Sequence, residues 1–209
     1  MQNFLRDATE FFPILLQGVG LTILVTVGSL ILSTILGVVW ALMRVSGVRV
    51  LSGLSAGLIN VIRGIPIIVL LFYLYFVMPD FGVTLTALQA AILGLGIAYS
   101  AYQAENFRAG IEAIDKGQIE AAQTIGMGWW LTMRRVVLPP YGNIMIMLLK
   151  DSSQASTITV AELALQGKLI ASSTFKNTSV FTLVALMYLT MSIPLILLVR
   201  HLEKRAERK

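Results

Sequence analysis

Long apolar segments alternate with short polar ones along the whole chain. The segment Ile14 to Met43 contains no charged residue, and about 20 consecutive apolar residues are enough to cross a bilayer as a helix. Four further apolar segments follow, the second interrupted by Arg63 and Gly64-Ile65-Pro66 and the fourth holding Lys150 and Asp151. The pattern predicts an all-α membrane protein with five transmembrane helices, over residues 14–43, 56–78, 85–104, 138–159 and 179–199.

The polar segments between these spans differ in length and charge. A short basic loop, a turn, a long polar segment, a polar loop and a basic tail are expected over residues 44–55, 79–86, 105–137, 161–178 and 201–209. Internal repeats and linkers are not apparent in the sequence. Residues 1–209 are therefore expected to form a single membrane domain.

Composition narrows the class of protein. Hydrophobic residues make up 56% of the chain and charged residues 13%, with a mean hydropathy of +0.81, whereas charged residues make up about 25% of an ordinary soluble domain. Cysteine is absent and the one histidine, His201, lies in the tail, so neither disulfides nor a metal site is expected. Catalytic constellations and a phosphate-binding loop are also missing from the sequence.

Positive charge indicates the orientation. Of the 16 Lys and Arg residues, eleven fall in the 44–55 loop, the 105–137 segment and the C-terminal end, three in the segments on the other side, and Arg63 and Lys150 within spans. The excess of Lys and Arg marks the cytoplasmic side. We therefore expect the N-terminus outside and the C-terminus in the cytoplasm. The net charge of +5 is spread over loops and the tail, so nucleic-acid binding is not expected. Because Met1–Phe12 carries charges of both signs, a cleavable signal is not expected either.

The 105–137 segment reads as two short helices joined by a turn. Ala121 and Ala122 favour helix and present small side chains, and Gly126 can adopt the left-handed conformation that ends a helix. A second short helix is expected to end before Pro139. The segment is thus expected to be a rigid lever that carries the acidic Glu120. The alternative is a solvated hairpin, in which this surface carboxylate contributes little.

The spacing of Glu120-Ala121-Ala122, Gly126 and Leu138-Pro139 resembles the cytoplasmic coupling loop of ABC importer permeases. In that family the loop docks into a cleft on the ATPase subunit. The resemblance implies that the ATPase contact is made by Glu120, Ala121, Ala122, Gly126, Leu138 and Pro139.

Five stretches in the same order extend the resemblance to the polar amino acid uptake branch of this family. They are Arg63-Gly64-Ile65-Pro66-Ile67, residues 102–111 (YQAENFRAGI), residues 116–122 (KGQIEAA), Lys150-Asp151-Ser152-Ser153 and Glu162-Leu163. The resemblance implies a five-helix type I permease in the bacterial inner membrane. It also implies a second permease subunit, two ATPase subunits that bind ATP and Mg²⁺, and an extracytoplasmic solute-binding protein; this chain itself would hold no cofactor.

Three features depart from the family pattern. Asn60 stands where the family usually has Glu, and Gln154 stands where it usually has Leu. After Leu138-Pro139-Pro140 the chain passes straight to Tyr141-Gly142-Asn143, without about two helical turns that usually separate two Leu-Pro pairs. This last departure leaves the geometry of the lever and the start of the fourth span open.

Polar residues in the fourth span indicate the translocation path. A polar helix is tolerated in a bilayer only where it faces protein or a watery cavity, and a charge at the bilayer centre costs about 2.5–3.5 kcal/mol. Lys150 is therefore expected to pair with Glu105 or Glu162, and Asp151 with Arg63 or Arg108; a purely structural role for these charges is the alternative. The candidate path and gating residues are Lys150, Asp151, Ser152, Ser153, Gln154, Glu105, Arg108 and Glu162.

Together these features predict the permease subunit of an ATP-driven importer for polar amino acids or related small zwitterions. It would work by alternating access and would not itself be an enzyme. The alternatives are a stand-alone secondary amino acid carrier, which would need broken helices in two related halves, and a membrane scaffold. The sequence leaves open which solute is transported and whether the second permease is a copy of this chain.

Overall fold

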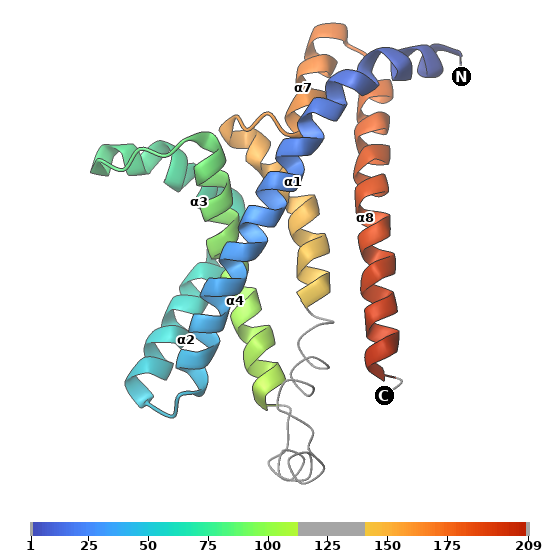
Figure 1. Cartoon of the computed structure of the whole chain (residues 1–209). Helices are drawn as coiled ribbons and strands as arrows, with labels where there is room; N and C mark the ends of the chain where they lie inside the picture. The colour runs from blue at the N-terminus through green and yellow to red at the C-terminus, as the bar shows by residue number, and fades with distance from the viewer. Residues whose placement is uncertain (1, 113–140, 208–209) are drawn as a thin grey trace.

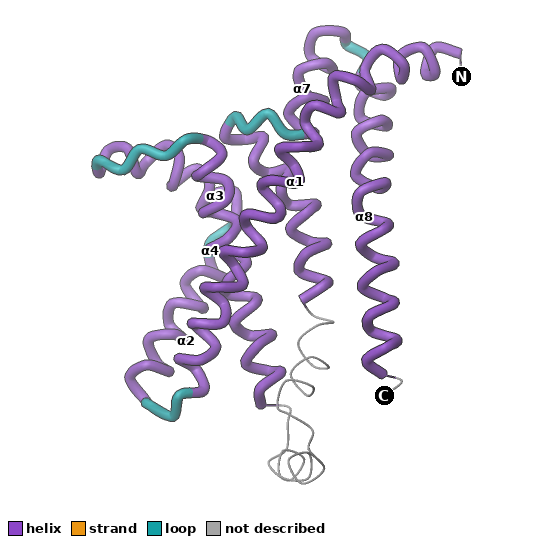
Figure 2. The backbone as a smooth tube through the Cα atoms, viewed as in Figure 1, coloured by secondary structure: helices purple, strands orange, loops and turns teal. Residues whose placement is uncertain are grey.

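The chain folds into helices joined by short turns (Figure 1). The computed structural model describes residues 2–112 and 141–207, and in these ranges it contains helices and loops but no strand (Figure 2). The predicted all-α class is confirmed for this part of the chain.

The N-terminal helix is the longest one in the described residues, and most of the other helices pack against it. Helix α1 (Gln2–Val45) has 44 residues and includes Pro13. A proline inside a helix removes one backbone hydrogen bond and favours a bend, and the N-terminal part of α1 runs at an angle to the rest (Figure 1). The predicted first span lies inside this helix, and the helix extends beyond the span at both ends.

The second predicted span is two helices rather than one. Helix α2 (Arg49–Gly64) begins after a turn in which Gly47 has φ 74°, inside the predicted loop. It ends at Ile65, whose extended backbone is the conformation that a following proline imposes. Beyond Pro66 the chain turns by 97° into α3 (Ile67–Phe72) and its short extensions η1 (Tyr73–Val77) and η2 (Met78–Phe81).

Helix α4 (Ala87–Glu112) corresponds to the third predicted span and continues beyond it. Its start is a capping box: the backbone N–H of Thr86 donates to Gln89 Oε1 at 2.9 Å, and the N–H of Gln89 donates to Thr86 Oγ1 at 3.2 Å. The described residues of α4 reach Glu112, so the first residues of the predicted 105–137 polar segment continue this helix.

The C-terminal third contains one helix that the sequence pattern did not predict. Residues 141–151 are α-helical and continue as the 3₁₀ helix η3 (Ser152–Ile158), which ends at Thr159 with φ 69°. The predicted 161–178 loop contains α7 (Leu163–Thr174), whose first turn is capped by Glu162. Helix α8 (Asn177–Glu207) then covers the fifth predicted span.

Only some of these helices are apolar enough to be assigned as membrane spans on hydropathy alone. Among the described residues they are Phe4–Val45 and Asn177–Leu202, and the bent pair Arg49–Gly64 with Ile67–Phe81 would be a third if it crosses as one. Helix α4 does not qualify because its middle is rich in glycine, alanine and polar residues, and many of these are buried against other helices. Small residues are what closely packed membrane helices require.

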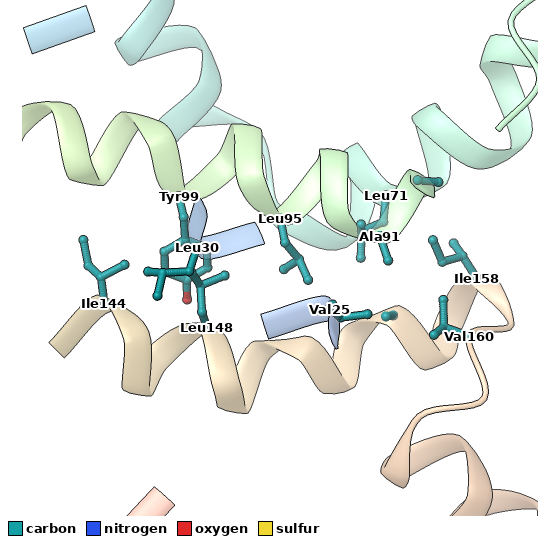
Figure 3. Packing of buried hydrophobic residues seen from close by; sticks show 12 residues of the cluster. Val25, Leu30, Leu71, Ala91, Leu95, Tyr99, Ile144, Leu148, Ile158 and Val160 are labelled. Atoms are coloured by element: carbon teal, nitrogen blue, oxygen red, sulfur yellow. The ribbon is translucent and has the colours of Figure 1, made fainter. Parts of the chain in front are cut away.

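Different elements lie at the two ends of the molecule (Figure 1). The N-terminus and α7 lie at one end, whereas the α1–α2 turn, the last residues of α4 and the C-terminus lie at the opposite end. The main apolar cluster lies between α1, α3, α4 and the 141–158 segment, as Figure 3 shows for Leu95, Tyr99 and Leu148. A second cluster joins α1, α7 and α8.

Candidate functional site

A tyrosine of α4 holds the aspartate of the 141–158 segment. Tyr99 is 1% exposed, and its hydroxyl donates to Asp151 Oδ2 at 2.6 Å. Figure 3 shows the Tyr99 side chain crossing from α4 towards the helix of Leu148. The predicted partners of Asp151, Arg63 and Arg108, are wrong. The signal that was missed is a tyrosine in an apolar run, because its hydroxyl needs a partner when buried.

The other predicted partners are also engaged elsewhere. The guanidinium of Arg63 lies over the ring of Tyr102, 5.4 Å from its centroid. Arg108 forms salt bridges with Glu105, at 2.7 Å, and with Glu112. The hydrogen bond that Arg108 donates to the Glu105 carboxylate is the main reason why the pKa of Arg108 is raised above its ordinary value. Glu105 is therefore a partner of the same helix rather than of Lys150, whose side chain is exposed.

The polar residues after Asp151 lie on a tightly wound helix. Ser152 is buried and its hydroxyl donates to the carbonyl of Leu149 at 2.7 Å, while Ser153 and Gln154 are half-buried. The 3₁₀ helix η3 has seven residues, although runs longer than three or four are uncommon and often mark a hinge or local strain. It lies against α3, α4 and α7. The structure thus places Asp151, Ser152, Ser153 and Gln154 together, where the α-helix of residues 141–151 tightens into the 3₁₀ helix η3.

Glu162 is the centre of a second polar cluster. The residue is fully buried, and its carboxylate accepts hydrogen bonds from the N–H groups of Ala164 and Leu165 at 2.9 and 2.8 Å. The hydroxyl of Tyr188 on α8 donates to it at 2.7 Å. Glu162 therefore caps α7 and ties it to α8. The predicted pairing of Glu162 with Lys150 is wrong.

Helix α1 completes this cluster. The N–H of Leu163 donates to Thr22 Oγ1 at 3.1 Å. One turn earlier, α1 approaches so closely that a Cβ on Gly18 would lie 2.7 Å from the Leu163 nitrogen. Glycine is thus required here for the approach of two backbones. We call Gly18, Thr22, Glu162, Leu163 and Tyr188 the Glu162 node.

The residues predicted to contact the ATPase lie outside the described residues. This applies to Glu120, Ala121, Ala122, Gly126, Leu138 and Pro139. Of the predicted path and gating residues, the structure brings Asp151, Ser152, Ser153 and Gln154 together, places Glu162 in its own node, and places Glu105 and Arg108 near the end of α4.

Comparison with known proteins identifies the family. Residues 33–208 match the family described as binding-protein-dependent transport system inner membrane component. The probable amino-acid ABC transporter permease YckA of Bacillus subtilis (strain 168) is 38% identical over 189 residues, covering 87% of this chain and 84% of that protein. The L-cystine transport system permease TcyB of the same organism is 37% identical over 208 residues, covering 95% of this chain and 89% of that protein.

Solved structures agree with this assignment. A chain from the crystal structure of an amino acid ABC transporter with histidines superimposes with a TM-score of 0.84 at 32% identity, covering 95% of this chain and 97% of that one. A chain of the inward-facing MetNI methionine ABC transporter gives a TM-score of 0.70 at 21% identity, over 93% of this chain and 97% of that one, and so shares the fold. The protein therefore belongs to the family of inner membrane components of binding-protein-dependent transport systems and has the type I ABC permease fold.

Proposed function

We propose that this chain is the permease subunit of an ATP-driven importer for polar amino acids or related small zwitterions. The observation that carries the proposal is the likeness to the amino acid ABC transporter chain, which extends over 95% of this chain at a TM-score of 0.84. Relatives named for transport of glutamine, cystine and nopaline support a polar amino acid as the solute.

The proposed topology has five crossings, with the N-terminus outside and the C-terminus in the cytoplasm of a bacterial inner membrane. The direction of the chain supports it, because successive segments α1, α2 with α3, α4, 141–158 and α8 run back and forth between the two ends (Figure 1). The distribution of Lys and Arg supports the orientation. In this topology the end that holds the α1–α2 turn and the C-terminus faces the cytoplasm, and α7 lies at the outer side.

The proposed path runs along the irregular segment that begins at Asp151. The 3₁₀ helix η3 offers Ser153 and Gln154 as half-buried polar groups, and polar groups at this depth must face protein or water. Lys150 and Asp151 would serve as gating charges in this proposal. Glu162 would position α7 and α8 rather than contact solute, because its carboxylate is fully buried and already accepts from two backbone N–H groups and from Tyr188.

The proposed coupling element is the segment 105–137. Arg108 links Glu105 and Glu112 along the last turns of α4, and paired charges three and four residues apart stabilise a helix. A stiffened helix end transmits a displacement better than a frayed one. The ATPase subunits would bind ATP and Mg²⁺ and push on this segment, while a second permease subunit and an extracytoplasmic binding protein complete the assembly.

Glu120→Lys tests the coupling role. The matched control is Asp80→Lys, which makes the same change of charge at an exposed position in η2. In proteoliposomes with the ATPase and binding protein, we expect Glu120→Lys to abolish solute uptake while the protein still inserts and purifies as the parent does. The control should transport normally. Unimpaired uptake by Glu120→Lys would refute the coupling role.

The stand-alone carrier is tested by the same preparation without the ATPase. We expect no uptake under an imposed proton or sodium gradient. Uptake by the chain alone would overturn the proposed class, whatever the result with Glu120→Lys.

A further inference from the structure

Helix α8 has an outward face that the rest of the chain leaves uncovered. Its inner face packs through residues such as Val180, Val184 and Met187, which are buried with α1 and α7. Its outer face carries Leu186, Ile193 and Leu197, which are 47%, 47% and 59% exposed. The most apolar part of α8 is only 28% buried, compared with 39% for that of α1.

The outer face changes from apolar to basic at the C-terminal end of the span. The apolar part of α8 ends at Leu202, but the helix continues to Glu207. Arg200 and Lys204 are exposed and follow Leu197 at spacings of three and seven, which on an α-helix is one face. His201 is exposed beside them. An apolar stripe about three turns long therefore ends directly in a basic surface.

This basic surface points away from the bundle. Val199 marks the inner side, because its Cγ2 would lie 2.5 Å from a Cβ on Gly142. At about 100° per residue, His201 and Lys204 fall roughly 140–160° from Val199 around the helix, and Arg200 about 100° from it. The exposed basic residues Arg200, His201 and Lys204 are therefore on the outer side of α8.

We propose that this end of α8 binds an anionic phospholipid. The phosphodiester headgroup would lie against Arg200, His201 and Lys204, and an acyl chain along Leu186, Ile193 and Leu197. Each Lys or Arg near an anionic membrane surface contributes about 1 kcal/mol of attraction, and guanidinium groups bind phosphate oxygens through paired hydrogen bonds. The proposal rests on the proposed crossing of the membrane by α8, and it does not require that the chain transports anything.

The charge and the stripe together favour a lipid over other occupants. A second copy of this chain would bring the same basic end against itself if the two α8 helices packed in parallel, with repulsion between like charges. A soluble acidic partner could contact the basic end but would leave the apolar stripe uncovered. An anionic phospholipid matches both parts at once.

The test measures lipid binding by native mass spectrometry of the purified full chain in detergent. The protein is titrated at low salt with phosphatidylglycerol, or with phosphatidylethanolamine of the same acyl chains. We expect tighter binding of phosphatidylglycerol, and binding about thirtyfold weaker for Arg200→Gln/Lys204→Gln, which corresponds to roughly 2 kcal/mol for two basic residues. The control double variant Arg6→Gln/Arg49→Gln makes the same change of charge at two exposed positions elsewhere and should bind as the parent does.

Three outcomes would overturn the proposal. They are equal binding of the two lipids, an equal loss in the control variant, and competition by free glycerol phosphate as effective as by the lipid, which would indicate a site for soluble phosphate. A separate experiment uses the absence of cysteine in the chain. Ile193→Cys in liposomes should not form a disulfide-linked dimer when copper phenanthroline is added as the oxidant; efficient dimer formation would show that a second copy covers the face.

Discussion

Glu162→Ala should be among the most destabilising single changes in the described part of the chain. The substitution removes the carboxylate that caps α7 through two backbone N–H groups. It also leaves the hydroxyl of Tyr188, a residue of α8 that donates to that carboxylate at 2.7 Å, without its partner. Both losses occur at a position with no exposed surface, so water cannot replace the carboxylate.

The expected loss of stability follows from these two effects. A lost helix cap costs about 0.5–2 kcal/mol, and a buried donor left without a partner costs about 1–3 kcal/mol. Part of this is offset because a buried carboxylate no longer has to be desolvated. We expect a net loss of about 3 kcal/mol, which for a chain of this size lowers Tm by roughly 6–12 °C.

Tyr188→Phe should cost less than Glu162→Ala, because the carboxylate keeps its two backbone donors. The double variant should be more stable than the sum of the two single losses implies, by about 1–3 kcal/mol, because the second change removes a group that the first left unpaired.

Thermal unfolding in detergent, followed by tryptophan fluorescence at a fixed scan rate, measures all three variants. Strict additivity, or a Tm within 2 °C of the parent for Glu162→Ala, would refute the assignment of Glu162 as the connection between α7 and α8.

The same unfolding assay checks the remaining predictions. Gly18→Ala places a Cβ 2.7 Å from a backbone nitrogen of α7 and should cost about 1–3 kcal/mol through overpacking. Gly20→Ala is the matched change two residues on, where a Cβ meets nothing within 4 Å, and should instead gain about 0.5–1 kcal/mol; equal effects at the two positions would contradict the close approach. Tyr99→Phe leaves Asp151 without its phenolic donor and should cost about 1–3 kcal/mol. Phe175 has a left-handed backbone at φ 57° and is 87% exposed. Phe175→Gly relieves this strain and should raise the free energy of unfolding by up to about 1 kcal/mol, with a slightly higher Tm. A large loss of stability would show that the aromatic ring is bound by another group.

The sequence predicted those helices that can be recognised from their own apolar residues, without knowledge of what packs against them. The apolar runs of α1 and α8 stand out because both helices keep a large apolar face that the rest of the described chain leaves uncovered, so their apolar character does not depend on packing. The change of direction at Pro66 was visible as a break, but its angle of 97° was not, since a broken span and a bent pair have the same composition. Helix α7 was read as a loop because it is short and partly polar.

The partners of the charged residues could not be predicted from the sequence for a different reason. Opposite charges are the partners that the sequence suggests, whereas the structure pairs Asp151 and Glu162 with tyrosines that are 52 and 26 residues away in sequence. The hydroxyl of a tyrosine in an apolar helix is a weak sequence signal, because the ring alone explains its presence. Only the packing of α4 and α8 shows which hydroxyl meets which carboxylate.

The polar contacts between helices lie where a helix ends or changes its winding, and this bears on how the subunit moves. A helix that ends or changes its winding away from water leaves backbone N–H and C=O groups unpaired. Thr22, on the uninterrupted helix α1, accepts from the N–H of Leu163 at the start of α7, and Tyr99 of α4 holds the last α-helical residue before η3. Polar side chains on continuous helices thus hold the places where other helices are interrupted. The Glu162 node is fully paired and tightly packed, so a rocking motion should carry α1, α7 and α8 together. The hydrogen bonds within η3 are those of a strained winding, and we therefore expect changes of shape during transport to concentrate between Asp151 and Thr159.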